Sequence, residues 1–494
     1  MTGKQREFRL SKSKIAMFEQ CPKRLWLHVH HPELGQPDMD TEARFAVGHE
    51  VGAVACRLIP TGVMVYAEPD LDTALAETRK LLDADEAQPI FEATLEHDGV
   101  LVRIDILEPD EANSWRLAEV KSSTGVKDYH MSELATQLWV AQRAGLAISG
   151  AAIRHIDNRF VLEREGDYHG LFIDSDQLAD LAQAIEDRPR VVQEAHSILD
   201  GKEPAITPGD QCKKPFDCEF SAYCNSSVPA GPQWPVTLLP NGGGKKFLAQ
   251  GIADLLALDP AMLTNGVQKR VYQATMTGAP YHDADNARQE MAKWPYPRTW
   301  LDFETIAFAV PRWMGTRPYQ QVPFQFSAHV EDADGKITHH DFLSLDGTDP
   351  RRACAEALVA SVPSSGAVIG YNASFERSRI LELAAAFPDL ADSLQDIAER
   401  VVDLLPITRA NWYHRDQRGS WSIKAVLPTI TDQLNYTNLA VKDGEQAQVA
   451  YIQAISPSTT EVRRAEIAVA LRTYCRLDTE AMILIAKRLE SVAG

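Results

Sequence analysis

Four cysteines constrain the fold of this chain more than any other feature. Cys21 stands alone near the start, whereas Cys212, Cys218 and Cys224 follow almost two hundred residues later with five residues in each gap. Thiolates from both ends of such a segment can bind one metal centre, which would close the long intervening loop. The sequence therefore predicts a first domain, residues 1–228, whose two ends are held together.

The nature of this centre stays open on spacing alone. Four thiolates suit structural zinc as well as an iron–sulfur cluster, and buried cysteines without a ligand are the third alternative. Aromatic residues stand between the clustered cysteines, a regularity that favours a bound metal. The odd total of seven cysteines is typical of a reducing compartment, where clustered cysteines bind metal more often than they form disulfides.

The length of 494 residues exceeds what a single hydrophobic core usually supports. Pro- and Gly-rich sequence over 226–244 and the phrase Trp-Pro-Tyr-Pro at 294–297 are typical of boundaries. We therefore predict a second segment, 229–295, that is a linker with a small helical part, and a third domain, 296–494.

Charge and hydropathy set limits on partners and location. The net charge of −19 is not typical of a nucleic-acid-binding protein, but catalytic carboxylates add to this total and basic pairs such as Lys213-Lys214 could line a groove. The start of the chain is polar, and no run approaches the roughly 18 apolar residues of a membrane span. We expect a cytoplasmic protein with no membrane partner, and the sequence gives no oligomeric state.

The first domain contains a pattern typical of metal-dependent hydrolysis. Residues 89–107 predict a β-hairpin that turns at Asp98-Gly99, and a further strand follows over 116–122. Alternation puts Glu119 and Lys121 on one face. Together with Asp105 on the hairpin, they could hold a divalent cation and orient the attacking water. The alternative is a solvated charged face.

These residues resemble the PD-(D/E)XK nucleases, in particular their RecB-type branch and its CRISPR-associated relatives. The phrase Cys-Pro-Lys-Arg-Leu-Trp at 21–26 resembles the first iron–sulfur ligand site of such exonucleases. The resemblance implies a restriction-endonuclease-like fold and a [4Fe–4S] cluster on the four cysteines, with zinc as the alternative. It also implies that Asp105, Glu119 and His49 bind the metal ion, with Glu50 as the alternative to His49. It further implies a catalytic role for Lys121.

The same branch carries a Gln-x-x-x-Tyr signature on the next helix. Gln137 matches its first position and is expected to contact nucleic acid, whereas Ala141 replaces the tyrosine.

The third domain contains a second set of acidic residues. Residues 298–305 predict a buried strand with Asp302 and Glu304 on one face. Residues 367–371 predict another strand, which leads into a helix that carries Glu376. Near the end of the chain, Asp478 shares a helical face with apolar residues. Four converging carboxylates could hold two metal ions; the alternative is that they cap or solvate their elements and that Asp478 pairs with an arginine.

These phrases resemble the DnaQ-like, or DEDD, 3′–5′ exonucleases, which have an RNase H-like fold. The resemblance implies that Asp302, Glu304, Glu376 and Asp478 bind Mg²⁺ or Mn²⁺. It further implies that Tyr474 positions the attacking water and that Asn372 contacts nucleic acid. Glu376 is one methylene longer than the aspartate usual at its position, which favours Mn²⁺, whose coordination is looser than that of Mg²⁺.

Taken together, the chain resembles a group of bacterial proteins known by a domain of unknown function, in which a RecB-like module precedes a DnaQ-like one. We expect an α/β protein that acts as a two-headed, metal-dependent nuclease, with DNA favoured over RNA, in repair, mobile-element processing or defence. The alternatives are an RNA-directed exonuclease and a non-catalytic nucleic-acid-binding or scaffold protein with one degenerate head.

Overall fold

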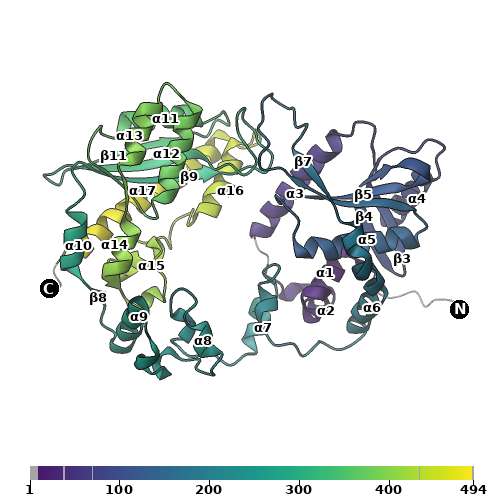
Figure 1. Cartoon of the computed structure of the whole chain (residues 1–494), viewed down its shortest axis with the longest axis horizontal. Helices are drawn as coiled ribbons and strands as arrows, with labels where there is room; N and C mark the ends of the chain where they lie inside the picture. Colours follow the sequence, from purple (N-terminus) through teal and green to yellow (C-terminus); the bar gives the residue numbers. More distant parts are fainter. Residues whose placement is uncertain (1–8, 37–38, 69, 433, 492–494) are drawn as a thin grey trace. The chain divides into compact units, whose positions relative to one another are not determined.

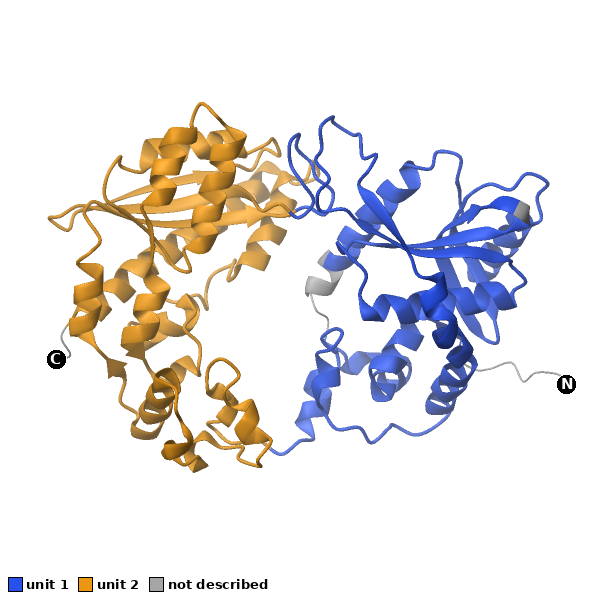
Figure 2. Ribbon diagram, in the orientation of Figure 1, with its two compact units in different colours: residues 1–229, 308–319 blue, residues 230–307, 320–494 orange. Residues whose placement is uncertain are grey.

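The computed structural model describes residues 9–36, 39–68, 70–432 and 434–491 and divides the chain into two compact α/β units (Figures 1 and 2). Unit 1 comprises Met1–Pro229 and Phe308–Tyr319, and unit 2 comprises Ala230–Ala307 and Gln320–Gly494. The mixed α/β class expected from the sequence is confirmed. None of the helices in the described ranges combines the length and apolar character that a membrane crossing requires.

Unit 1 is built on a seven-stranded sheet in the order β2-β3-β4-β5-β6-β7, with β1 parallel to β4. The predicted hairpin is confirmed: Asp98 and Gly99 both have positive φ (48° and 75°), as a tight hairpin turn requires. The strands are β1 (Leu10–Ser11), β2 (Val63–Met64), β3 (Ile90–His97), β4 (Val100–Pro109), β5 (Trp115–Lys121), β6 (Ile148–Ile156) and β7 (Phe172–Asp176).

Helices cover both faces of this sheet. On β5, Leu117 packs in one core with Leu134 of α5, whereas Ala118 packs on the opposite face with Ala55 of α3. Alternation along β5 therefore places Glu119 and Lys121 on the α5 face. The helices of unit 1 are α1 (Lys12–Gln20), α2 (Pro22–His30), α3 (Met39–Arg57), α4 (Leu71–Leu82), α5 (Asp128–Arg143), α6 (Ala182–Leu199) and α7 (Ser221–Ser226).

Unit 2 has a five-stranded mixed sheet in the order β11-β10-β9-β12-β13. β9 lies at its centre, antiparallel to β10 and parallel to β12, and the predicted strands at 298–305 and 367–371 correspond to β9 and β12. The strands of this sheet are β9 (Arg298–Ile306), β10 (Val322–Glu331), β11 (Ile337–Leu343), β12 (Ala367–Gly370) and β13 (Val401–Asp403). A separate two-stranded antiparallel sheet pairs β8 (Tyr281–His282) with β14 (Trp412–Tyr413).

Alternation along β9 separates two cores. Leu301 packs with residues of α11, α12 and α13, whereas Trp300 packs with Met482 of α17 on the other face, and Figure 1 shows α17 in yellow along the sheet. The helices are α8 (Lys245–Leu248), α9 (Gly266–Thr277), α10 (Ala284–Met291), α11 (Arg351–Ser361), α12 (Ser374–Ala386), α13 (Ala391–Glu399), α14 (Leu404–Asn411), α15 (Ile423–Val426), α16 (Gly444–Ile455) and α17 (Glu461–Glu490).

Two segments are assigned differently from the boundaries drawn on composition. Residues 230–295, nearly the whole of the predicted linker segment, are part of unit 2, because Trp234, Phe247 and Val271 are buried in the core that also contains Trp300. Residues 308–319, which connect β9 to β10, are part of unit 1.

The segment 308–319 fills an apolar site in unit 1. Ala309 and Val310 are buried against Val51, Val54 and Leu171. Backbone hydrogen bonds fix the segment, from Gly315 N to Leu162 O at 2.8 Å and from Leu162 N to Thr316 O at 3.0 Å. Its last residue, Tyr319, donates its hydroxyl hydrogen to the carbonyl of Ser122, which directly follows β5.

Candidate metal centres

The first centre lies where β4 and β5 run side by side. Glu119 is 1% exposed and lies on the face of β5 that packs against α5. Asp105 is joined to the same strand, because its Oδ2 accepts a hydrogen bond from the backbone N of Val120 at 2.8 Å. Lys121 Nζ lies 2.9 Å from Glu119 Oε1 and also contacts Glu133 on α5. The structure thus brings the predicted Asp105, Glu119 and Lys121 together.

A second lysine, absent from the predicted set, completes this centre. Lys12 Nζ lies 2.8 Å from Oε1 and 2.9 Å from Oε2 of Glu119, and 3.6 Å from Oδ1 of Asp105. Lys12 is the first residue of α1, and the pairing of β1 with β4 brings the start of this helix to the carboxylates.

The pKa values of the two carboxyl groups in the first centre shift in opposite directions. Burial and the nearby Glu119 carboxylate raise the pKa of Asp105 to about 7. Burial also acts to raise the pKa of Glu119, but the ammonium groups of Lys12 and Lys121 outweigh it and hold that pKa well below its ordinary range. Glu119 is therefore ionised at neutral pH, and Asp105 is poised to exchange a proton for a cation.

Two other residues predicted for this centre have different surroundings. Gln137 is fully buried, and its Nε2 donates to Glu119 Oε2 at 2.5 Å. This hydrogen bond orients the Glu119 carboxylate, and the contact of Gln137 with nucleic acid stays a prediction. His49 is exposed on α3 and, within the described ranges, forms no hydrogen bond or ion pair with Asp105 or Glu119. The neighbouring Glu50 lies 3.4 Å from Arg312.

The four cysteines predicted to act together line one cavity in unit 1. Cys21 is the residue between α1 and α2, and Cys218 N donates to Cys212 O at 2.9 Å. Gln20 ties α1 to the cysteine loop, because its Nε2 donates to the carbonyls of Gln211 and Phe216. Helix α1 therefore has Lys12 of the first centre at its start and a cysteine of the cavity at its end.

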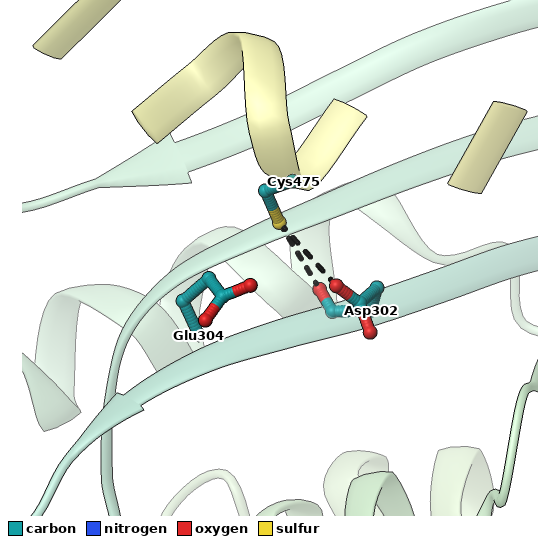
Figure 3. A group of neighbouring side chains, drawn as sticks. All are labelled: Asp302, Glu304 and Cys475. Carbon is teal, nitrogen blue, oxygen red and sulfur yellow. Dashed lines mark hydrogen bonds between the residues drawn. The ribbon is translucent and has the colours of Figure 1, made fainter. Parts of the chain in front are cut away.

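The second centre lies on the α17 face of the unit 2 sheet. Asp302 and Glu304 project from β9 toward Cys475 of α17 (Figure 3). One potential ligand atom from each of these residues lies within 4.8 Å of the others. The Cys475 Sγ is 3.8 Å from both the carbonyl oxygen and Oδ2 of Asp302. The sequence analysis assigned no role to Cys475, so its position beside Asp302 is a finding of the structure.

Asp478 lies one helical turn after Tyr474 on α17, and both side chains are buried. Tyr436 donates its hydroxyl hydrogen to Asp478 Oδ1, and Tyr474 also forms a hydrogen bond with this carboxylate. The Lys424 ammonium lies 5.5 Å from the ring of Tyr436 and 5.3 Å from that of Tyr474. Tyrosine and lysine side chains thus surround Asp478, and no arginine is needed to explain its burial.

Glu376, on the first turn of α12, is 3% exposed. Among the described residues, its Oε2 has no hydrogen-bond partner, and this carboxylate acts electrostatically on Asp302. A buried carboxylate oxygen without a partner is costly, so Glu376 is a fitting ligand for a cation. Asn372 precedes this helix in an exposed position with a φ of 69°. Its backbone N donates to Asp403 Oδ1 at 2.9 Å.

The carboxyl groups of the second centre repel one another. Burial raises the pKa of Glu304 to about 8 and that of Asp302 well above its ordinary value. The negative charge of the neighbouring Asp478 is the second largest cause of both increases. Burial raises the pKa of Glu376 to about 8 and that of Asp478 to about 6. Clustered carboxyls with raised pKa values are typical of functional sites, and divalent cations would relieve the repulsion.

We expect Glu304→Gln to stabilise the metal-free protein at pH 8. The pKa of Glu304 is raised on folding, so the folded state binds more protons than the unfolded state, and stability falls as pH rises from about 4 to about 8. Removing the charge at pH 8 should restore about 2 kcal/mol and raise the melting temperature by about 5 °C in EDTA. At pH 5 the carboxyl is already protonated, so the substitution should have little effect. An equal shift at both pH values would contradict this explanation.

Comparison with known proteins gives a match to one family over part of the chain, and distant similarities to other proteins. Residues 299–422 match the family described as "Domain of unknown function (DUF2779)", a stretch that contains Asp302, Glu304 and Glu376. A relative from Mycoplasma pneumoniae (strain ATCC 29342 / M129 / Subtype 1), "Uncharacterized protein MG366 homolog", is 28% identical over 207 residues, which are 38% of this chain and 31% of that protein. This chain therefore matches about a third of that relative's length.

Among solved structures, "Crystal structure of SSO0001" is similar over 46% of this chain and 90% of that chain, at 13% identity and a TM-score of 0.25.

Proposed function

We propose that this protein is a two-headed, metal-dependent nuclease that hydrolyses phosphodiester bonds, with DNA as the favoured substrate. The observation that carries the proposal is the second centre, where Asp302, Glu304, Glu376 and Asp478 are gathered with raised pKa values. Among the residues that the structure describes, Glu376 Oε2 there has no hydrogen-bond partner. An isolated cluster of buried carboxylates is unfavourable. Two divalent ions would neutralise it and, when bound, would supply an attacking hydroxide and stabilise the leaving oxygen.

The surrounding residues of the second centre have roles that suit this chemistry. The Tyr474 hydroxyl, which forms a hydrogen bond with Asp478, would orient a water molecule at the carboxylates. The Lys424 ammonium partly offsets the rise in the pKa values of Glu304 and Asp478, so it favours the ionised forms that would bind metal. The central position of β9 in a mixed sheet supports an RNase H-like fold of the DnaQ type. The 3′–5′ polarity follows from that resemblance.

The first centre suits a second hydrolytic head of the restriction-endonuclease-like PD-(D/E)XK type. Asp105 and Glu119 would hold one divalent ion, since they come from adjacent strands and face the same space. Lys121 remains beside them through its contacts with Glu119 and Glu133, where its ammonium can stabilise phosphate charge or orient water. Gln137 fixes the second oxygen of Glu119.

The cysteine cavity supports a bound metal centre, because all four cysteines line it. Four thiolates suit structural zinc and a [4Fe–4S] cluster alike. We propose the [4Fe–4S] cluster because the phrase Cys-Pro-Lys-Arg-Leu-Trp at 21–26 resembles the first ligand site of iron–sulfur RecB-type exonucleases. When bound, the cluster would tie the start of unit 1 to residues 212–224.

We expect Cys218→Ser to remove a broad absorbance near ~400 nm from protein purified without oxygen. We also expect lower first-head activity, because the start of unit 1, which pairs β1 with the Asp105 strand, would lose its tie to residues 212–224. Iron and sulfide analysis with absorbance spectra provides the measurement. Cys56→Ser is the matched control, since Cys56 lies in unit 1 but does not line the cavity. A colourless wild-type protein that contains stoichiometric zinc, despite iron supply and anaerobic preparation, would contradict the cluster.

The overall proposal is tested by digestion of end-labelled single- and double-stranded DNA and RNA with Mg²⁺ or Mn²⁺. We expect metal-dependent cleavage of DNA that EDTA stops. Preferential cleavage of RNA would assign the RNA-directed alternative. Binding of nucleic acid without cleavage by the wild type, under every metal condition, would assign a non-catalytic scaffold.

A further inference from the structure

We propose that Lys12 is an internal cation that holds the metal position of the first centre and must leave before a divalent ion binds. It thereby sets the metal concentration at which the first head becomes active. This inference rests on the proposed function of the centre, because it concerns the same two carboxylates.

Lys12 contacts the carboxylate oxygens that a metal ion in the first centre would bind. Its Nζ lies 2.8 and 2.9 Å from the two oxygens of Glu119 and 3.6 Å from Oδ1 of Asp105. A divalent ion that binds both carboxylates needs ligand oxygens at roughly 2.0–2.1 Å for Mg²⁺. Such an ion would occupy the volume that the ammonium now fills. Lys12 and the ion therefore exclude each other.

The position of Lys12 in its helix is unfavourable without these carboxylates. Leu10 and Ser11 pair in register with Val100 and Leu101 of β4, which fixes the start of α1. Lys12 then occupies the first helical position, where the helix dipole disfavours a positive charge. Ion pairing with Asp105 and Glu119 offsets this cost.

Lys12 and Lys121 differ in their ion-pair partners. Lys121 also contacts Glu133, so it keeps a partner when a metal ion takes over Glu119. The ion pairs that the structure describes for Lys12 join it to Asp105 and Glu119 alone. Its side chain is 23% exposed, so part of the lysine side chain already lies at the surface. Metal entry thus displaces Lys12 and leaves Lys121 in place.

The experiment measures Mn²⁺ affinity by titration calorimetry in full-length protein that carries Asp302→Asn and Asp478→Asn, so that the first centre dominates binding. Relative to this background, Lys12→Met should bind Mn²⁺ at least about tenfold more tightly, a difference of roughly 1.4 kcal/mol. Lys14→Met is the matched control on the same helix, since Lys14 Nζ donates to the carbonyl of Arg9. It should leave the affinity unchanged. Lys12→Arg, which keeps the charge, should bind no more tightly than the background.

Two results would overturn the inference, and they are distinguishable. Unchanged or weaker Mn²⁺ binding in Lys12→Met, alongside background binding that Asp105→Asn removes, would mean that Lys12 only positions Glu119; the proposed nuclease centre would stand. Absence of Mn²⁺ binding in the background and in every Lys12 variant would remove the metal centre itself. Lys12→Gln, which retains a hydrogen-bond donor for Glu119, must show the same tightening as Lys12→Met. Circular dichroism checks that each variant is folded, and Lys12→Gln decides the question if the methionine variant does not fold.

Discussion

Asp478→Asn should abolish shortening of a single DNA strand from its 3′ end, with a loss of at least about 10³-fold. Asp478 acts on both Asp302 and Glu304, and loss of a metal ligand removes several kcal/mol of transition-state stabilisation. The rate is measured on strands labelled at either end, in a protein whose first head is silenced by Lys121→Met.

The matched control is Glu480→Gln on the same helix, because Glu480 lies 2.8 Å from Arg476 at the surface. It should retain the rate of the Lys121→Met protein. Shortening that begins at 5′ ends, or that continues in Asp478→Asn, would mean that the carboxylates of unit 2 serve another purpose.

Asp105→Asn is expected to reduce cleavage by the first head by a comparable factor, at least about 10³-fold. Asparagine keeps the size of the side chain but lacks the charge that a divalent ion requires. The assay uses an Asp302→Asn protein, in which the second head is inactive, with double- and single-stranded DNA and Mg²⁺ or Mn²⁺.

Glu108→Gln provides the control on the same strand, since Glu108 pairs with Arg154 at 3.6 Å rather than with the centre. Full activity is expected for it. If Asp105→Asn cleaves as fast as its parent protein, the Asp105, Glu119 and Lys121 set is an ion-pair network without catalytic function.

Local periodicity was sufficient to predict how most acidic residues are placed. Two-residue alternation correctly put Glu119 with Lys121 and Asp302 with Glu304, because these segments are extended strands in which side chains two positions apart share a face. Helical spacing correctly put Asp478 on the apolar face of α17, next to buried neighbours.

The sequence could not reveal the residues that approach these centres from elsewhere in the chain. Lys12 lies 107 positions from Glu119, and only the pairing of β1 with β4 brings them together. Tyr436 reaches Asp478 from 42 positions away. The rotation of α17 on the sheet decides that Cys475 faces Asp302. Such contacts depend on tertiary packing, for which a single sequence carries no periodic signal.

The segment 308–319 has a consequence for synthesis on the ribosome. Nascent domains generally fold in order from the N-terminus, but the apolar site formed by Val51, Val54 and Leu171 needs Ala309 and Val310 to cover it. Those residues are made only after 230–307, all of which belongs to unit 2. The apolar surface of unit 1 therefore stays exposed until residues 230–307 of unit 2 have been synthesised. A chain that ends at residue 229 lacks Ala309 and Val310, which complete this apolar cluster of unit 1.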